Sequence, residues 1–160
     1  MNRKGQIATY DLLFAVIVFM AIFLLMNNIW AENYANALKK EETRRMQFSA
    51  RQAIKVLTGS AGYPEEWTSE DVEVPGLLEE HGSKRLSNEK IEELDGMDYN
   101  AVKDLLKIGE YDFMISVNAL NDLYDKEIGL PVSGESKAVR LERVVYYKGG
   151  NANVSLTLFK

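Results

Sequence analysis

Residues 12–26 read LLFAVIVFMAIFLLM and contain no polar side chain. The apolar character extends on both sides, from Ile7 to Trp30. A helix of that length rises by roughly 36 Å, and this is enough to cross a hydrocarbon core of about 30 Å. Trp30 ends the stretch, at the place where an amphipathic ring suits a membrane interface. The sequence therefore predicts a transmembrane helix over residues 6–30.

The apolar stretch alone leaves three interpretations open. A cleaved secretory signal would fit the basic start and an Ala-x-Ala site at Ala35-Asn36-Ala37, although that site lies far beyond the apolar residues. A permanent membrane anchor would fit the length of the stretch. A buried helix of a soluble core fits less well, because the stretch is apolar on all sides and the remaining chain is too small to surround it.

A fourth interpretation comes from the residues in front of the apolar stretch. The sequence Lys4-Gly5-Gln6, followed by Asp11, resembles the N-terminus of archaeal type IV pilin-like proteins with a class III signal peptide. In that family a prepilin peptidase cuts between Gly and Gln on the cytoplasmic side. The resemblance implies a leader peptide of residues 1–5 and a mature protein that begins at Gln6 and keeps its apolar helix.

The resemblance covers about thirty N-terminal residues, and the charge of the leader would come from Arg3 and Lys4. A second match is the stretch GYPEEW at residues 62–67, with Gly76-Leu77 after it, which is similar to the heads of archaeal pilin-like proteins. The resemblance implies an assembly ATPase, a membrane platform protein and other pilin subunits as partners. It also implies a membrane location before assembly and a surface filament afterwards.

Asp11 is the candidate assembly residue. A carboxylate at the edge of an apolar helix is costly unless it is paired or lies near the interface. Cleavage would create an α-amino group on Gln6, and the Asp11 carboxylate of a neighbouring subunit would neutralise it. The sequence departs from the family here, since members often carry an acid at the fifth mature position, which is Tyr10 in this chain. The alternative is that Asp11 lies among lipid headgroups.

The resemblance implies a cytoplasmic N-terminus and an exterior head. The positive-inside rule taken alone does not give that orientation. Arg3 and Lys4 precede the apolar stretch, whereas four basic residues follow soon after it within residues 39–45. The functional alternative to a pilin is a single-pass anchored exterior domain that binds or senses and does not polymerise.

The rest of the chain has the pattern of a soluble α+β head on a helical stem. No Pro or Gly occurs from Gln6 to Thr58, so we expect residues 31–58 to extend the helix and Gly59 to end it in a left-handed conformation. One face of this extension is apolar and should pack against the head, which comprises residues 59–160. The members of that face are Met46, Ala50, Ala53, Ile54 and Leu57.

Within the head, a loop at residues 60–76 is expected to be anchored by apolar side chains. They are Tyr63, Trp67, Val72 and Val74. Ser87 and Asp98 are predicted to cap helices at 88–94 and 99–107, with Gly109 just beyond the second helix. Antiparallel strands are predicted at 111–117, 138–147 and 154–158, with a hairpin turn at 148–151, and a surface loop at 119–137.

The head contains no sequence motif for catalysis. The chain of 160 residues has no Cys and a single His, His81, so neither a disulfide nor a zinc site is expected. No phosphate-binding or dinucleotide-binding motif is present, and we expect no enzyme activity, metal or cofactor. The net charge of −5 argues against nucleic acid as a partner. Asn153-Val154-Ser155 is an N-glycosylation sequon, which suits an exterior protein.

Overall fold

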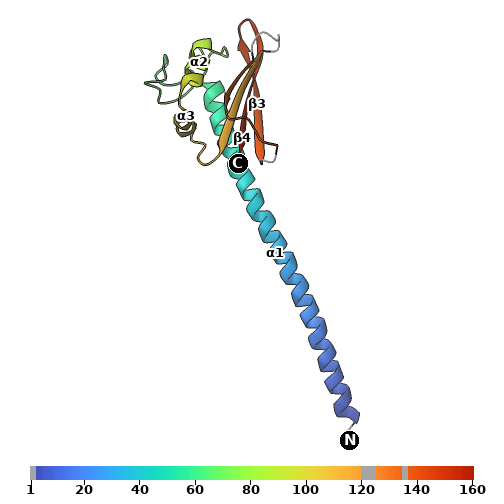
Figure 1. Cartoon of the computed structure of the whole chain (residues 1–160). Coiled ribbons are helices and arrows are strands. Elements are labelled where there is room, and N and C mark those ends of the chain that lie inside the picture. Colours follow the sequence, from blue (N-terminus) through green and yellow to red (C-terminus); the bar gives the residue numbers. More distant parts are fainter. Residues whose placement is uncertain (1–2, 120–124, 135–136) are drawn as a thin grey trace. The chain divides into compact units, whose positions relative to one another are not determined.

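The computed structural model describes the backbone of residues 3–119, 125–134 and 137–160, and the side chains within those ranges from residue 12 onward. The chain divides into two compact units, residues 1–42 and 43–160. The first is helical throughout its described part. The second, which we call the head unit, contains the end of the same helix, two short helices and a four-stranded sheet (Figure 1).

The long helix α1 extends from Arg3 to Gly59. Its last turns lie within the head unit, and the predicted apolar face is buried there: Met46, Ala50 and Leu57 are fully covered. The prediction that this face packs against the head is therefore confirmed. The prediction for Gly59 is only partly correct, because α1 ends there but Gly59 does not adopt a positive φ. The exit of the helix is instead stabilised by a backbone hydrogen bond from the Leu77 N–H to the Leu57 carbonyl.

The segment that follows α1 is held by a buried tryptophan. The indole N–H of Trp67 donates to the carbonyl oxygens of Ala61 at 3.1 Å and Gly76 at 2.8 Å. Only 2 % of Trp67 is exposed, so the prediction that it anchors this loop is confirmed. The same prediction for Tyr63 is wrong, since 60 % of this residue is exposed. Tyr63 instead contributes main-chain hydrogen bonds to Val74, so its aromatic character was a misleading signal.

Two short helices follow, and both begin at the predicted caps. Helix α2 spans Asn88–Gly96, and the Ser87 hydroxyl accepts a hydrogen bond from the Lys90 N–H at its first turn. Helix α3 spans Tyr99–Leu106, and the Asp98 carboxylate accepts from the N–H groups of residues 100 and 101. Polar side chains at these positions satisfy amides that have no partner inside the helix. The left-handed residue that ends α3 is Lys107, with φ 53°, two residues before the predicted Gly109.

The sheet is antiparallel with the strand order β2-β1-β4-β3. Its strands are β1 (Asp112–Ala119), β2 (Asp125–Gly129), β3 (Ala138–Tyr147) and β4 (Gly150–Phe159). Strands β3 and β4 form a hairpin whose two loop residues, Lys148 and Gly149, both have positive φ. This backbone matches the twist of the flanking strands. The predicted hairpin turn is present but shorter than residues 148–151, because Gly150 and Asn151 already pair with β3.

Strand β2 was not predicted from the sequence, where residues 119–137 have the pattern of a surface loop. The reason is that Ile128 is the only apolar side chain among its five residues, so the alternating pattern of a strand is absent. Pairing with β1 holds the strand in place, together with two ion pairs at 2.8 Å from Lys126 to Glu92 and Asp95 of α2. Residues 120–124 and 135–136 of the expected loop lie outside the described part of the chain.

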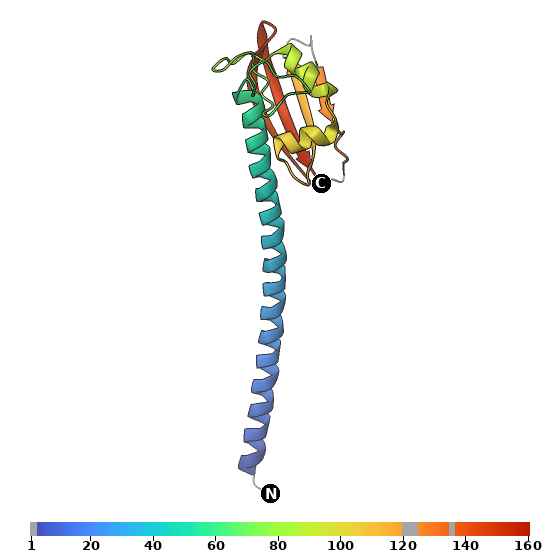
Figure 2. The same cartoon turned by 90° about the vertical axis from the view of Figure 1, so that its left-hand side faces the viewer.

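One face of the sheet carries the core of the head unit. Alternate residues of β1 and β4, among them Ile115, Val117, Val154 and Leu156, are fully buried. Both views place α2, α3 and the last turns of α1 over the same face of the sheet (Figures 1 and 2). The chain is thus an α+β protein with a long N-terminal helix and a small antiparallel sheet.

Candidate functional site: the exposed apolar helix and the head surface

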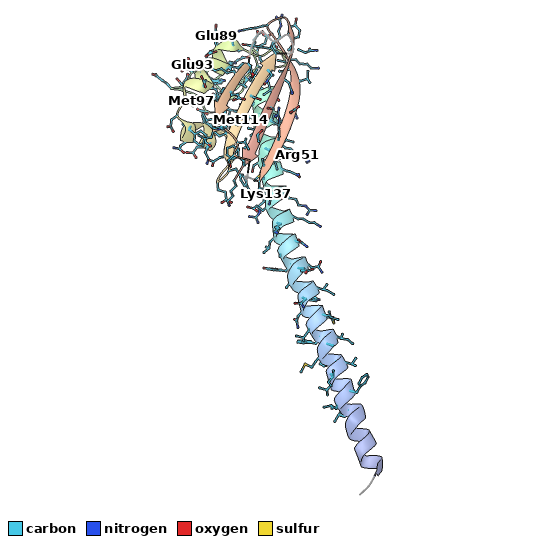
Figure 3. The ribbon with its side chains drawn as sticks, turned by 45° about the vertical axis from the view of Figure 1, so that its right-hand side comes forward. Arg51, Glu89, Glu93, Met97, Met114 and Lys137 are labelled. Atoms are coloured by element: carbon cyan, nitrogen blue, oxygen red, sulfur yellow. The ribbon has the colours of Figure 1, made fainter. Side chains whose placement is uncertain are left out.

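The largest unusual surface of the chain is the apolar part of α1. From Leu12 to Trp30 no described side chain is buried, and exposed fractions include 70 % for Phe14 and 74 % for Trp30. The side chains project on all sides of the helix (Figure 3). Helix α1 is long and apolar enough to cross a membrane by length and composition. A soluble monomer rarely exposes an apolar patch beyond a few hundred Å², so this surface requires lipid or other protein around it.

The predicted cleavage and assembly residues lie at the start of this helix. The backbone from Arg3 onward is helical, which places the Gly5–Gln6 bond in the first turn of α1. Because the amides of a first turn have no partner inside the helix, loss of residues 1–5 would cost only the hydrogen bonds that the carbonyls of residues 3–5 accept from the next turn. The side chains of Arg3, Lys4, Gln6 and Asp11 lie outside the part that the structure describes. The pairing of Asp11 with an α-amino group therefore stays a prediction.

The sequon residue Asn153 lies on the central strand β4, on the face opposite to the core. Its neighbours Ala152 and Val154 are fully buried, whereas Asn153 itself is half-buried. Its side-chain amide donates to Glu142 Oε2 at 3.0 Å. This hydrogen bond, together with the charge of Arg140, lowers the pKa of the Glu142 carboxyl. A glycan on Asn153 would have to displace or accommodate that contact, and glycosylation stays a prediction.

Lys90 is a structural residue that the sequence did not reveal. It lies in α2 within a polar stretch typical of a helix surface, yet only 6 % of it is exposed. Its ammonium donates to the carbonyl oxygens of Ala61 at 2.8 Å and Leu78 at 2.7 Å. Burial lowers the pKa of this amine. Lys90 thus connects α2 to two segments that follow α1, and only the tertiary structure shows it.

An acidic depression lies beside Lys90. It encloses about 750 Å³, and four carboxylates line it: Glu66, Glu79, Glu89 and Glu93. Glu89 and Glu93 both project from α2 (Figure 3). Glu93 accepts a hydrogen bond from the Ser69 N–H, so part of this charge stabilises the loop after α1. Among the described residues, no three His, Cys, Asp or Glu side chains gather closely enough to hold a metal ion.

The head unit also has an apolar groove between α1 and the end of α3. We call it the Phe48 groove, and it encloses about 390 Å³. Its main lining residues are Phe48, Gln52 and Val56 of α1, Val74 of the following loop, and Leu105 and Lys107 at the end of α3. Phe48 is 65 % exposed and Val74 39 % exposed, so apolar surface faces solvent here.

With the geometry described, the chain can be compared with known proteins. No protein-family model, curated protein or solved structure matches it. Function must therefore be argued from the chain's own residues. His81, the single histidine, is exposed in a turn, where its backbone N–H donates to Glu65 Oε1. No described buried side-chain N or O atom lacks a hydrogen-bond partner.

Proposed function

We propose that this chain is a structural subunit of an archaeal type IV pilus-like filament that serves surface adhesion. The observation that carries the proposal is the apolar part of α1, residues 12–30, where every side chain is exposed, preceded by Lys4-Gly5-Gln6. A helix that is apolar on all sides loses little when it moves from lipid into a bundle of like helices, because both surroundings are apolar. The proposal makes α1 the shared core of the filament and the head unit its outer surface.

The partners follow from this assignment. A prepilin peptidase removes residues 1–5 at the cytoplasmic face, and an assembly ATPase with a membrane platform protein moves the subunit out of the bilayer. Before assembly the chain is held in the membrane with its N-terminus in the cytoplasm and its head outside. After assembly it lies at the cell surface, where Asp11 of one subunit neutralises the α-amino group of Gln6 of the next.

The first test is the N-terminus of the protein taken from membranes and from any sheared surface filaments. Mass spectrometry of the N-terminal peptide is expected to give Gln6. An intact Met1, with no copies in filaments, would contradict the pilin assignment and favour the second candidate, a single-pass anchored exterior binding or sensor domain. That candidate is supported by the same apolar helix, which has the length of an anchor.

The second test addresses Asp11 directly. Asp11→Ala should strongly reduce the number of filaments, because an α-amino group left unpaired in an apolar core is costly. Asp11→Glu is the matched control, since it keeps the carboxylate and should keep filaments. If Asp11→Ala cells assemble filaments as the parent does, the neutralisation step is wrong, although the rest of the assignment is unaffected.

A further inference from the structure

The Phe48 groove has the shape of a site for a helix. Three of its residues, Phe48, Gln52 and Val56, occur at spacings of four along α1 and form one edge. Over eight residues this edge is about 12 Å long. The opposite edge comes from Val74 and the end of α3. An amphipathic helix binds such a groove through large side chains spaced three or four residues apart along one face.

The chain itself contains a segment with that spacing. Trp30, Tyr34 and Leu38 lie one turn apart on α1, and their exposed fractions are 74, 69 and 55 %. They lie in the first compact unit, just beyond the continuous apolar residues, among polar neighbours such as Glu32 and Asn36. Lipid tails would therefore not cover them in the way they cover residues 12–26. The segment is also about 12 Å long, because Trp30 and Leu38 are separated by the same eight steps along the helix as Phe48 and Val56.

We propose that the Phe48 groove binds residues 30–38 of α1 from a second copy of this chain. The proposal deepens the filament function and rests on it, because it names the segment through which one subunit holds the next. In this arrangement Tyr34 of one copy lies opposite Gln52 of the other. The two α1 helices are then offset by about 18 residues, with the apolar side chains of each covered by the other.

The charges select the direction of the incoming helix. Residues 39–45, which follow Leu38, read KKEETRR with a net charge of +2. The loop at residues 65–73 carries five carboxylates and no basic residue, and Glu73 lies at the groove itself. A parallel orientation brings the basic residues toward Glu73, the one of these five carboxylates that lines the groove. An antiparallel orientation would bring the basic residues toward Arg45, Lys107 and Glu110, where the Glu110 carboxylate already forms an ion pair with Lys160.

Cysteine pairs test the contact directly, since the natural chain has no Cys. The full chain carrying Tyr34→Cys and Gln52→Cys is expressed in the source cells, and oxidative crosslinks between copies are measured in membranes and in sheared filaments. We expect a ladder of crosslinked oligomers. The control pair is Asn36→Cys with Gln52→Cys, because Asn36 lies on the far side of the same helix, and its yield should be several-fold lower.

Variants of the groove give a second measurement. Phe48→Glu should abolish the ladder while the thermal unfolding of the head stays unchanged, because Phe48 is not part of the core. Arg44→Glu, at a position on the same side of the helix as Tyr34, and Glu73→Lys should each lower the crosslink yield, and the double reversal should restore it. If Phe48→Glu leaves the ladder intact, or if the reversal restores nothing, the assigned contact is wrong.

The outcomes also separate this inference from the proposed function. Filaments without the ladder, or equal yields from the test and control pairs, overturn the groove contact and leave the filament assignment in place. A ladder in membranes without any filament supports the contact and overturns the filament assignment. Absence of both the ladder and the filaments overturns both proposals.

Discussion

Replacement of Lys90 by Met removes an ammonium and keeps most of the apolar volume of its side chain. The ammonium donates two hydrogen bonds, to the carbonyl oxygens of Ala61 and Leu78, at 2.8 and 2.7 Å. Hydrogen bonds from charged groups contribute about 1.5–3 kcal/mol each to stability, and the loss leaves two buried carbonyls without this donor. The cost of burying the charge offsets part of that gain. We expect Lys90→Met to lower the free energy of unfolding by about 2–4 kcal/mol.

The pH dependence of this loss follows from the lowered pKa of Lys90. The unfolded chain binds a proton at this amine up to about pH 10.5, whereas the folded chain releases it at a lower pH. Between the two pKa values the unfolded state holds more protons, so the stability of the parent protein rises with pH. The variant lacks this contribution. The destabilisation caused by Lys90→Met should therefore grow as the pH approaches 10.

The measurement is urea unfolding of the full chain in detergent, followed by circular dichroism of the sheet at several pH values. Lys84→Met is the matched control, because Lys84 is exposed and its side chain forms no hydrogen bond or ion pair within the described part of the chain. It should change the free energy of unfolding by less than about 0.5 kcal/mol. If Lys90→Met unfolds at the same urea concentration as Lys84→Met, the hydrogen bonds of Lys90 do not stabilise the head.

Three further substitutions test the head. Gly76→Ala should lower the free energy of unfolding by more than about 2 kcal/mol, because the added Cβ would lie 2.2 Å from a backbone nitrogen. Gly96→Ala is the control and should leave the stability unchanged, since open space surrounds Gly96. Thermal melts of the two variants measure the difference. Asp112→Asn should cost under about 1 kcal/mol at neutral pH. The Lys103 ammonium lowers the pKa of the Asp112 carboxyl. The difference in stability between the parent and Asp112→Asn should therefore disappear as the pH falls through that lowered pKa. Unfolding measured across an acid titration tests this. Lys126→Met removes both ion pairs to α2 and should lower the free energy of unfolding by about 0.5–1 kcal/mol. Added salt should reduce the difference in urea midpoint between the parent and this variant.

Much of the fold could be predicted from local patterns. The apolar face from Met46 to Leu57, the caps at Ser87 and Asp98, and the hairpin at residues 148–149 each depend on residues close together in sequence. Their physical causes are helical spacing, the satisfaction of first-turn amides, and the backbone preferences of a two-residue turn. All three causes act between residues that are close together in the sequence, so the sequence alone is enough to predict these features.

The features that were missed depend on partners far away in the sequence. Strand β2 has one buried apolar residue, and its position is determined by β1 and by the ion pairs of Lys126. Lys90 resembles any surface lysine until the carbonyl of Ala61, 29 residues away, is placed beside it. Tyr63 shows the opposite error, because an aromatic residue in a loop suggested a core contact that the structure does not contain.

Phe48 connects the fold to the proposed function. The core of the head unit uses the opposite face of α1, so the fold gives no reason for an aromatic residue that is 65 % exposed beside Val56 and Val74. An exposed apolar patch on a soluble head favours association, and a polar residue at this position would avoid it at no cost to the core. A partner that covers Phe48 gives the residue a role. Because Trp30, Tyr34 and Leu38 need cover for the same reason, one contact between two copies satisfies both surfaces.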